Sequence, residues 1–135
     1  MREKDILVVD DEAGVREVLA GVLRDNGYAV DLAATAAEAR TLLDEYRYGM
    51  VIADWRLPDG DGVAIANLAA ATGSHAFVMS AFLTQMLSGS IDPRRTLMKP
   101  LRPSELLAIA RACIGKGREA ADRQRQAREP SPDGC

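Results

Sequence analysis

The stretch that decides the fold runs from Met50 to Gly62 and reads MVIADWRLPDGDG. It opens with four apolar residues, continues into Asp54 and closes in a turn rich in proline, aspartate and glycine. A short apolar run bounded by turn residues is typical of a strand that is buried on both faces of a parallel sheet. Asp54 then lies at the carboxyl end of that strand, the edge at which open α/β sheets bind ligands. An aspartate there can serve as a metal ligand, a nucleophile or a turn-former.

Strand and helix patterns alternate along the chain on both sides of this stretch. Alternating or continuous apolar runs predict strands at 5–10, 28–33, 49–54, 76–80 and 96–99. Single apolar faces predict helices at about 12–26, 36–46, 62–72 and 103–114, and Thr35 and Glu38 form a capping box before the second. A short or frayed helix is expected in 82–94, which Gly89 and Pro93 interrupt. The pattern predicts an α/β fold, a doubly wound five-stranded parallel sheet with helices on both faces.

The bulk composition excludes several classes of protein. A chain of 135 residues suffices for one domain, and its net charge of -3 offers no basic field for nucleic acid or for an anionic membrane. No apolar run is long enough to span a membrane, and the first residues lack the apolar core of a signal peptide. Cys113 and Cys135 form neither a disulfide framework nor a zinc pattern. We therefore expect a cytoplasmic protein.

Four of the predicted strands end in a residue that can handle phosphate or metal. These residues are Asp10 and Asp11 after the first strand, Asp54, Ser80 and Lys99. They converge because the carboxyl ends of parallel strands lie at one edge of the sheet. Three carboxylates repel one another unless a cation lies between them, and hard oxygen ligands favour Mg²⁺.

This set of residues is suited to phosphoryl transfer. A carboxylate beside a bound divalent ion can attack phosphorus and form an aspartyl phosphate. The transferred group spreads negative charge over its oxygens, which the cation, the Lys99 ammonium and the Ser80 hydroxyl can stabilise. Each assignment has a simpler alternative. Asp11 could cap the following helix, Lys99 could be a solvated loop cation, and Ser80 could be a small residue that fills the strand end.

Over residues 5 to about 115, the chain resembles the receiver domain of two-component response regulators. The resemblance implies a flavodoxin-like sheet with the strand order 2-1-3-4-5. Any one of the matching motifs is a weak signal, but all four in order on successive strand ends are a strong one. They are Val8 to Glu12, Asp54 to Gly60, Ser80-Ala81 and Lys99-Pro100.

The resemblance also implies roles for the residues at the sheet edge. Asp54 would take a phosphoryl group from the phosphohistidine of a histidine kinase or of a histidine phosphotransfer protein. Lys99 would pair with the phosphoryl oxygens, and Ser80 would move to hydrogen-bond them. The implied Mg²⁺ ligands are Asp10 through water, Asp11, Asp54 and the backbone carbonyl of Arg56.

Two departures from the family pattern affect the expected switch between inactive and active states. Ser80 and the residue three before Lys99 are the switch positions, and the latter, commonly aromatic in the family, is Thr96 here. The interval between Ser80 and Lys99 is also short. We hypothesise that activation orders the segment 82–95 instead of rotating an aromatic ring.

The expected organisation is a receiver domain over 1–117, followed by a polar helix extension and disordered tail over 118–135. With no output domain predicted, the protein is expected to signal through a downstream protein partner, as a monomer or a phosphorylation-dependent dimer. It would contact neither nucleic acid nor membrane, and would catalyse only its own phosphorylation and dephosphorylation.

Two other functions compete with this one. A degenerate receiver would bind partners without phosphorylation, and Thr96 keeps that alternative open. A haloacid-dehalogenase-like phosphatase also uses an aspartate at a strand end, but it requires an Asp-x-Asp motif after the first strand, where this chain has Asp10, Asp11 and Glu12.

Overall fold

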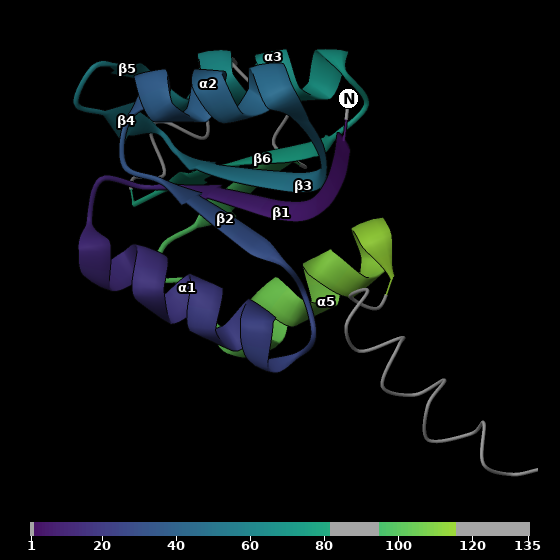
Figure 1. The fold of residues 1–135 in the computed structure, drawn as a ribbon. Coiled ribbons are helices and arrows are strands. Elements are labelled where there is room, and N and C mark those ends of the chain that lie inside the picture. Colours follow the sequence, from purple (N-terminus) through teal and green to yellow (C-terminus); the bar gives the residue numbers. More distant parts are fainter. Residues whose placement is uncertain (1, 82–94, 116–135) are drawn as a thin grey trace, which may run out of the picture.

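The computed structural model describes residues 2–81 and 95–115. Its centre is a five-stranded sheet with the order β2-β1-β3-β6-β7, in which all neighbouring strands are parallel (Figure 1). Because β6 and β7 are the fourth and fifth strands of this sheet along the chain, the order confirms the predicted 2-1-3-4-5 arrangement. The strands are β1 (Arg2–Val9), β2 (Val30–Ala33), β3 (Tyr46–Asp54), β6 (His75–Ser80) and β7 (Thr96–Met98).

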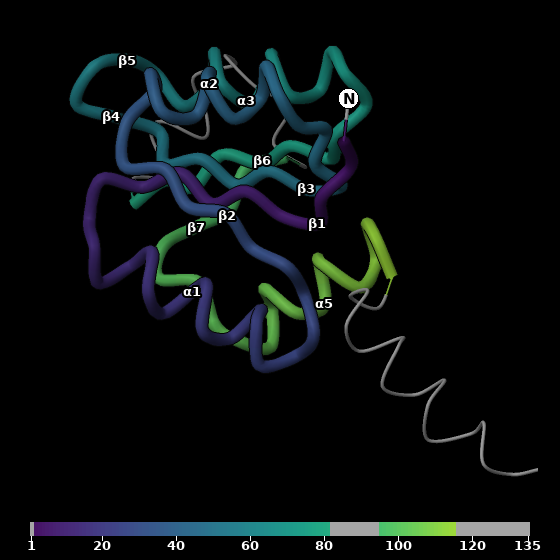
Figure 2. The backbone as a smooth tube through the Cα atoms, in the orientation of Figure 1, coloured from purple at the N-terminus to yellow at the C-terminus, as the bar shows by residue number. Residues whose placement is uncertain are grey.

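Helices cover both faces of the sheet. Two of them, α1 (Ala13–Asp25) and α5 (Pro103–Ile114), pack side by side on one face. The other two, α2 (Ala36–Glu45) and α3 (Gly62–Ala71), pack on the opposite face, and the tube in Figure 2 shows the chain crossing between the two layers. The predicted doubly wound α/β architecture is therefore confirmed.

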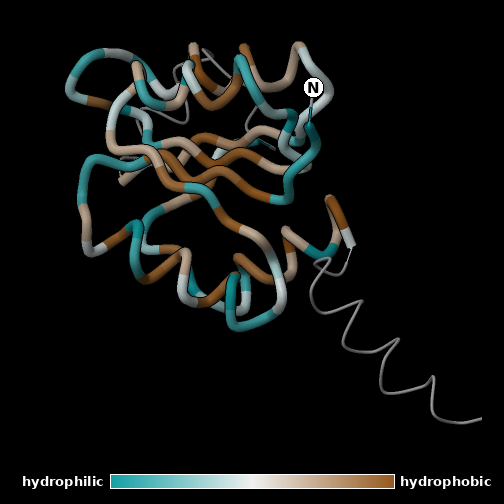
Figure 3. Tube along the Cα trace, viewed as in Figure 1, coloured by the Kyte–Doolittle hydropathy of each residue, from teal (hydrophilic) through white to brown (hydrophobic). Residues whose placement is uncertain are grey.

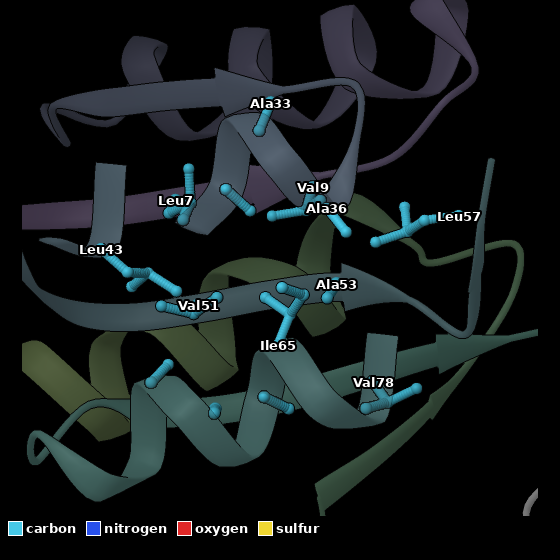
Figure 4. Packing of buried hydrophobic residues seen from close by; sticks show 14 of the residues in the cluster. Leu7, Val9, Ala33, Ala36, Leu43, Val51, Ala53, Leu57, Ile65 and Val78 are labelled. Atoms are coloured by element: carbon cyan, nitrogen blue, oxygen red, sulfur yellow. The ribbon is translucent and has the colours of Figure 1, made fainter. Parts of the chain in front are cut away.

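The sheet separates two hydrophobic cores, which explains the uninterrupted apolar runs at 6–9 in β1 and 50–53 in β3. In β3, Met50 and Ile52 face the core under α1 and α5, whereas Val51 and Ala53 face the core under α2 and α3. Successive side chains of a strand point to opposite faces, so a strand covered on both sides needs a continuous apolar run. Figure 3 shows the hydrophobic strands at the centre, and Figure 4 shows the core beneath α2 and α3.

Local sequence signals fix the ends of the helices. Asn26 caps α1 and is followed by Gly27 at a φ of 89°, the left-handed conformation that glycine adopts without a steric penalty. The Thr35 side chain accepts a hydrogen bond from the Glu38 amide at the start of α2. Glu38 reaches back to the Ala34 amide, 3.5 Å away, so the Thr35 half of the predicted capping box is confirmed and the return bond differs by one residue.

Two local predictions were wrong. Tyr46 was expected on the inner face of the second helix, but it is the first residue of β3 and pairs with Arg2. Aromatic residues favour strands, and the Lys4 ammonium of β1 lies 3.9 Å from the centre of the Tyr46 ring. This contact joins the amino ends of β1 and β3, and both strands begin earlier in the sequence than predicted. Between the predicted strand 49–54 and the predicted helix 62–72, where no strand was predicted, the chain forms a two-stranded antiparallel hairpin of β4 (Arg56–Leu57) and β5 (Gly60–Asp61).

Some expectations lie outside the described residues. They are the short helix in 82–94, most of the segment 82–95 whose ordering was hypothesised, and the polar extension over 118–135. Within 2–81 and 95–115, no helix combines the length and the apolar character that crossing a membrane requires.

Candidate functional site

The four predicted strand ends meet at the carboxyl edge of the sheet. Asp10 directly follows β1, Asp54 ends β3, Ser80 ends β6 and Lys99 directly follows β7. Lys99 joins two of these ends, because its ammonium lies 2.9 Å from the Asp10 carboxylate and 3.3 Å from that of Asp54. The backbone amide of Lys99 donates to the Ser80 carbonyl at 2.8 Å, which ties the third end to the same place. The convergence expected from the parallel sheet is therefore present.

Lys99 is the cationic centre of this site. Its side chain is only 18% exposed, and a third carboxylate, that of Glu12, lies 4.0 Å from its ammonium. Burial alone lowers the pKa of Lys99, but the hydrogen bond and charge of Asp10, followed by those of Asp54, outweigh it and raise that pKa. Lys99 therefore stays positively charged beside Asp54 at neutral pH.

Asp54 lies in a crowded anionic environment. Its side chain is 15% exposed. Partial burial, and then the neighbouring Asp10 carboxylate, raise the pKa of Asp54, while Lys99 opposes the shift without cancelling it. The ionised form of Asp54 is thus less favourable than that of an aspartate in water. An additional positive charge at this edge would relieve the repulsion.

An acidic cluster supplies ligands for such a charge. Carboxylate oxygens of Asp10, Asp11 and Glu12 lie within 4.8 Å of one another, with Asp10 buried and the other two exposed. A donor set made only of oxygen atoms, one of them on a fully buried carboxylate, fits a hard divalent cation such as Mg²⁺. Asp54, another predicted ligand, is not a member of this compact group. Arg56, whose backbone carbonyl is the remaining predicted ligand, is the first residue of β4, two residues after Asp54.

Two neighbours of Asp10 were missed as site residues in the sequence. The Glu12 amide donates to the Asp10 carboxylate at 2.8 Å, and the Arg16 guanidinium donates to the Asp10 backbone carbonyl at 2.6 Å. These bonds fix the turn from β1 into α1 and with it the direction of the Asp10 side chain. Glu12 stood in the acidic run of the sequence, but no sequence signal pointed to the contact of Arg16.

The chain after Asp54 is held at both ends. The Trp55 amide donates to the Met79 carbonyl of β6, and the Gly62 amide donates to the Trp55 carbonyl, each at 2.8 Å. A Cβ atom at position 62 would lie 1.8 Å from the Asp54 carbonyl oxygen, so only glycine fits there. Trp55 is partly buried and packs against the core.

Ser80 and Thr96 are both buried at the β6–β7 side of the site. Thr96 pairs with Val78, and Ser80 pairs with Met98. Residues paired across a sheet and residues two apart along a strand point to the same face, so both hydroxyl side chains lie on one face of the sheet. The two predicted switch positions are thus neighbours in space, although 16 positions separate them in the sequence.

An apolar groove of about 660 Å³ runs along α1 and ends at the site. Val15, Val18 and Leu19 of α1 line it, as do Lys99 and Glu12 of the site. Val18 is 61% exposed, more than Met98 at 43% and Leu68 at 41%. A molecule that approaches Asp54 past Lys99 would meet this apolar surface.

Comparison with known proteins places the chain among signalling domains. The model of the response regulator receiver domain family matches residues 6–111. Over 125 residues the chain is 34% identical to response regulator Rre1 of Synechocystis sp., covering 87% of this chain and 54% of Rre1. Over 119 residues it is 34% identical to the DNA-binding response regulator MtrA of Mycobacterium tuberculosis, covering 83% of this chain and 50% of MtrA. The chain thus spans about half the length of these curated relatives.

A solved structure shares the same fold. The CheY-like response regulator receiver domain protein from Methanospirillum hungatei superimposes with a TM-score of 0.69 at 24% sequence identity. The alignment covers 83% of this chain and 92% of that protein. Because the sequence identity is this low, the comparison shows that the two proteins share a fold, and we infer nothing from it about individual side chains.

Proposed function

The chain belongs to the response regulator receiver domain family, and on that basis we propose that Asp54 accepts a phosphoryl group from the phosphohistidine of a histidine kinase or of a histidine phosphotransfer protein. The observation that carries the proposal is the 3.3 Å approach of the Lys99 ammonium to the Asp54 carboxylate at the edge of the sheet. The proposed nucleophile and the cation that would stabilise the transferred group are therefore side by side.

The chemistry follows from these two side chains. A carboxylate oxygen of Asp54 attacks phosphorus, the bond from phosphorus to the donor's histidine nitrogen breaks, and its electron pair remains on the imidazole. Lys99 holds a positive charge next to the oxygens on which negative charge accumulates during the transfer. The protein would catalyse only this reaction on itself and the later hydrolysis of its own aspartyl phosphate.

We assign the metal site to the acidic residues at the same edge. Asp10, Asp11, Asp54 and the backbone carbonyl of Arg56 would hold Mg²⁺, which when bound neutralises the carboxylates and the incoming phosphoryl group. Glu12 lies close enough to the Asp10 and Asp11 carboxylates to join them, directly or through water. Partial burial and then the Asp10 carboxylate raise the pKa of Asp54, and a divalent cation would relieve the repulsion from Asp10, which supports this assignment.

Ser80 and Thr96 would carry the signal away from Asp54. The Ser80 hydroxyl would bond the phosphoryl oxygens, and Thr96, on the same face of the sheet, would respond to that movement. A phosphoryl group adds a charge of about -1.5 to -2 at neutral pH, enough to bias a two-state surface. The output would be altered binding of a downstream protein partner, by a monomer or by a phosphorylation-dependent dimer, in the cytoplasm.

The donor protein would dock on the apolar groove along α1. Its phosphohistidine would reach Asp54 close to Lys99 and Glu12, which line that groove. The exposed side chain of Val18 would then be covered in the complex. DNA binding is a property named for MtrA, and we do not extend it to these residues.

A single experiment separates this function from its competitors. The protein and its Asp54→Asn variant are incubated with Mg²⁺ and either acetyl phosphate or beryllofluoride. Hydroxylamine-labile phosphate on the wild type that is absent from the variant supports the proposal. Binding of neither reagent would favour a phosphorylation-independent binding module, and sustained turnover of a phosphate ester would favour a phosphatase.

A further inference from the structure

Asp59 connects the turn after Asp54 to the N-terminus of a helix distant in the sequence. Its two carboxylate oxygens accept hydrogen bonds from the Ala36 amide at 2.7 Å and from the Ala37 amide at 3.0 Å. These are the first two amides of α2, which have no partner within the helix. The residue in the usual capping position, Thr35, accepts instead from the Glu38 amide at 3.1 Å. Asp59 is thus a second, long-range cap of α2.

The rest of the turn is seated on the same end of α2. Leu57 is buried in the core cluster that also contains Ala36 (Figure 4). A Cβ atom at Gly60 would lie 3.1 Å from the Ala36 Cβ, so the turn approaches the helix closely. The β4–β5 hairpin is therefore fixed to α2 by one polar side chain, one apolar side chain and a close backbone approach.

The other end of this hairpin lies at the site. Arg56 is the first residue of β4, two positions after Asp54 and three before Asp59. The two strands pair over only two residues each, Arg56 with Asp61 and Leu57 with Gly60. So short a ladder stabilises the hairpin only weakly. The hydrogen bonds of Trp55 with Met79 and Gly62 hold its base, and the bonds from Asp59 to α2 hold its turn.

We propose that Asp59 is a positioning residue for divalent-cation binding, because its bonds to α2 hold the hairpin so that the Arg56 carbonyl points into the acidic site. This inference rests on the proposed function, in which that carbonyl is a metal ligand. It goes beyond that function by making the N-terminus of α2 part of the support of the metal site. Groups that orient metal ligands typically change metal affinity about 10- to 100-fold when removed.

A purely structural role of Asp59 would give a different result, and Thr35, the other cap of α2, provides the control. If Asp59 only caps the helix, removing it should affect α2 in the same way as removing Thr35, which caps the same turn from within the helix's own segment through the Glu38 amide. The comparison of Asp59→Ala with Thr35→Ala therefore separates support of the metal site from stability of the helix.

The experiment measures Mg²⁺ affinity directly, without phosphorylation. Isothermal titration calorimetry with magnesium chloride is combined with the emission of Trp55, the single tryptophan of the chain and the residue next to Asp54. We expect Asp59→Ala to weaken Mg²⁺ binding roughly tenfold and Thr35→Ala to leave it within about twofold of the wild type. Asp59→Asn keeps one acceptor oxygen and should recover part of the affinity.

The outcomes are distinct. Unchanged Mg²⁺ affinity in Asp59→Ala, or an equal loss in Asp59→Ala and Thr35→Ala, would overturn the inference. If Asp59→Ala does not fold, Asp59→Asn takes its place against Thr35→Ala, with an expected loss of several-fold. A wild-type protein that binds no Mg²⁺ would instead refute the proposed function, so the two failures can be told apart.

Discussion

The ammonium of Lys99 lies closer to the buried carboxylate of Asp10, at 2.9 Å, than to the carboxylate of Asp54, at 3.3 Å. Lys99 follows the last strand of the sheet and Asp10 follows the first in sequence, and they meet because the parallel strands bring both ends to one edge. Asp10 thereby anchors the lysine within reach of Asp54.

Removing the Lys99 ammonium should slow phosphorylation. We expect Lys99→Ala to lower the rate of labelling by acetyl phosphate at saturating Mg²⁺ about 100-fold, since one charged group that stabilises the transferred phosphoryl is lost. Lys4→Ala is the matched control, because Lys4 also forms an ion pair at 2.9 Å, with Asp31, away from the site. Equal rates for the two variants would exclude a role of Lys99 in the transfer.

Neutralising Asp54 should stabilise the metal-free protein. Burial and then the Asp10 charge raise the pKa of Asp54, so the folded protein holds a proton there more tightly than the unfolded chain does. Ionisation of Asp54 therefore costs folding free energy, and that cost is present above the raised pKa and disappears below the unfolded value of about 3.9.

We accordingly expect Asp54→Asn to raise the urea midpoint at neutral pH without Mg²⁺. The gain should shrink as the pH falls through the window between the raised pKa and the ordinary one, because wild-type Asp54 becomes protonated there. Asp44→Asn, on the exposed side of α2, serves as the control. A variant less stable than the wild type at neutral pH would contradict the inferred cost of ionising the partly buried Asp54.

Gly62 should not tolerate a side chain. The 1.8 Å approach to the Asp54 carbonyl forces the backbone to move, so Gly62→Ala is expected to destabilise the fold by about 3 kcal/mol and to disturb phosphorylation. Gly21→Ala in the interior of α1 is the opposite case, because nothing lies within 4 Å of its Cβ position. It should stabilise the fold by about 0.5–1 kcal/mol. Urea unfolding of both variants checks the contrast.

The groove along α1 should matter for a protein donor and not for a small one. We expect Val18→Glu to slow phosphotransfer from a histidine kinase at least tenfold, because a carboxylate would be buried against the donor, while labelling by acetyl phosphate stays unchanged. Leu68→Glu is the matched control, since Leu68 is 41% exposed on α3, on the opposite face of the sheet. If the kinase phosphorylated all three proteins equally, the docking face would have to lie elsewhere.

The sequence by itself determined the strand ends of the site. Apolar runs such as the one before Asp54 predict buried parallel strands, and parallel strands bring their carboxyl ends to one edge whatever the helices between them do. The convergence of Asp10, Asp54, Ser80 and Lys99 could therefore be predicted from local patterns alone. The same patterns missed the change from helix to strand at Tyr46, where pairing with β1 decides the outcome.

Only the tertiary structure decided how these residues are held and charged. The raised pKa of Asp54 depends on burial and on its proximity to Asp10, and the contact of Arg16 with the Asp10 carbonyl depends on the path of the β1–α1 turn. In the sequence Asp59 has the pattern of an ordinary turn residue, but in the structure it caps a helix that begins 23 positions earlier. Local periodicity encodes which face and which end of an element a residue occupies, whereas such contacts depend on how separately encoded elements pack together.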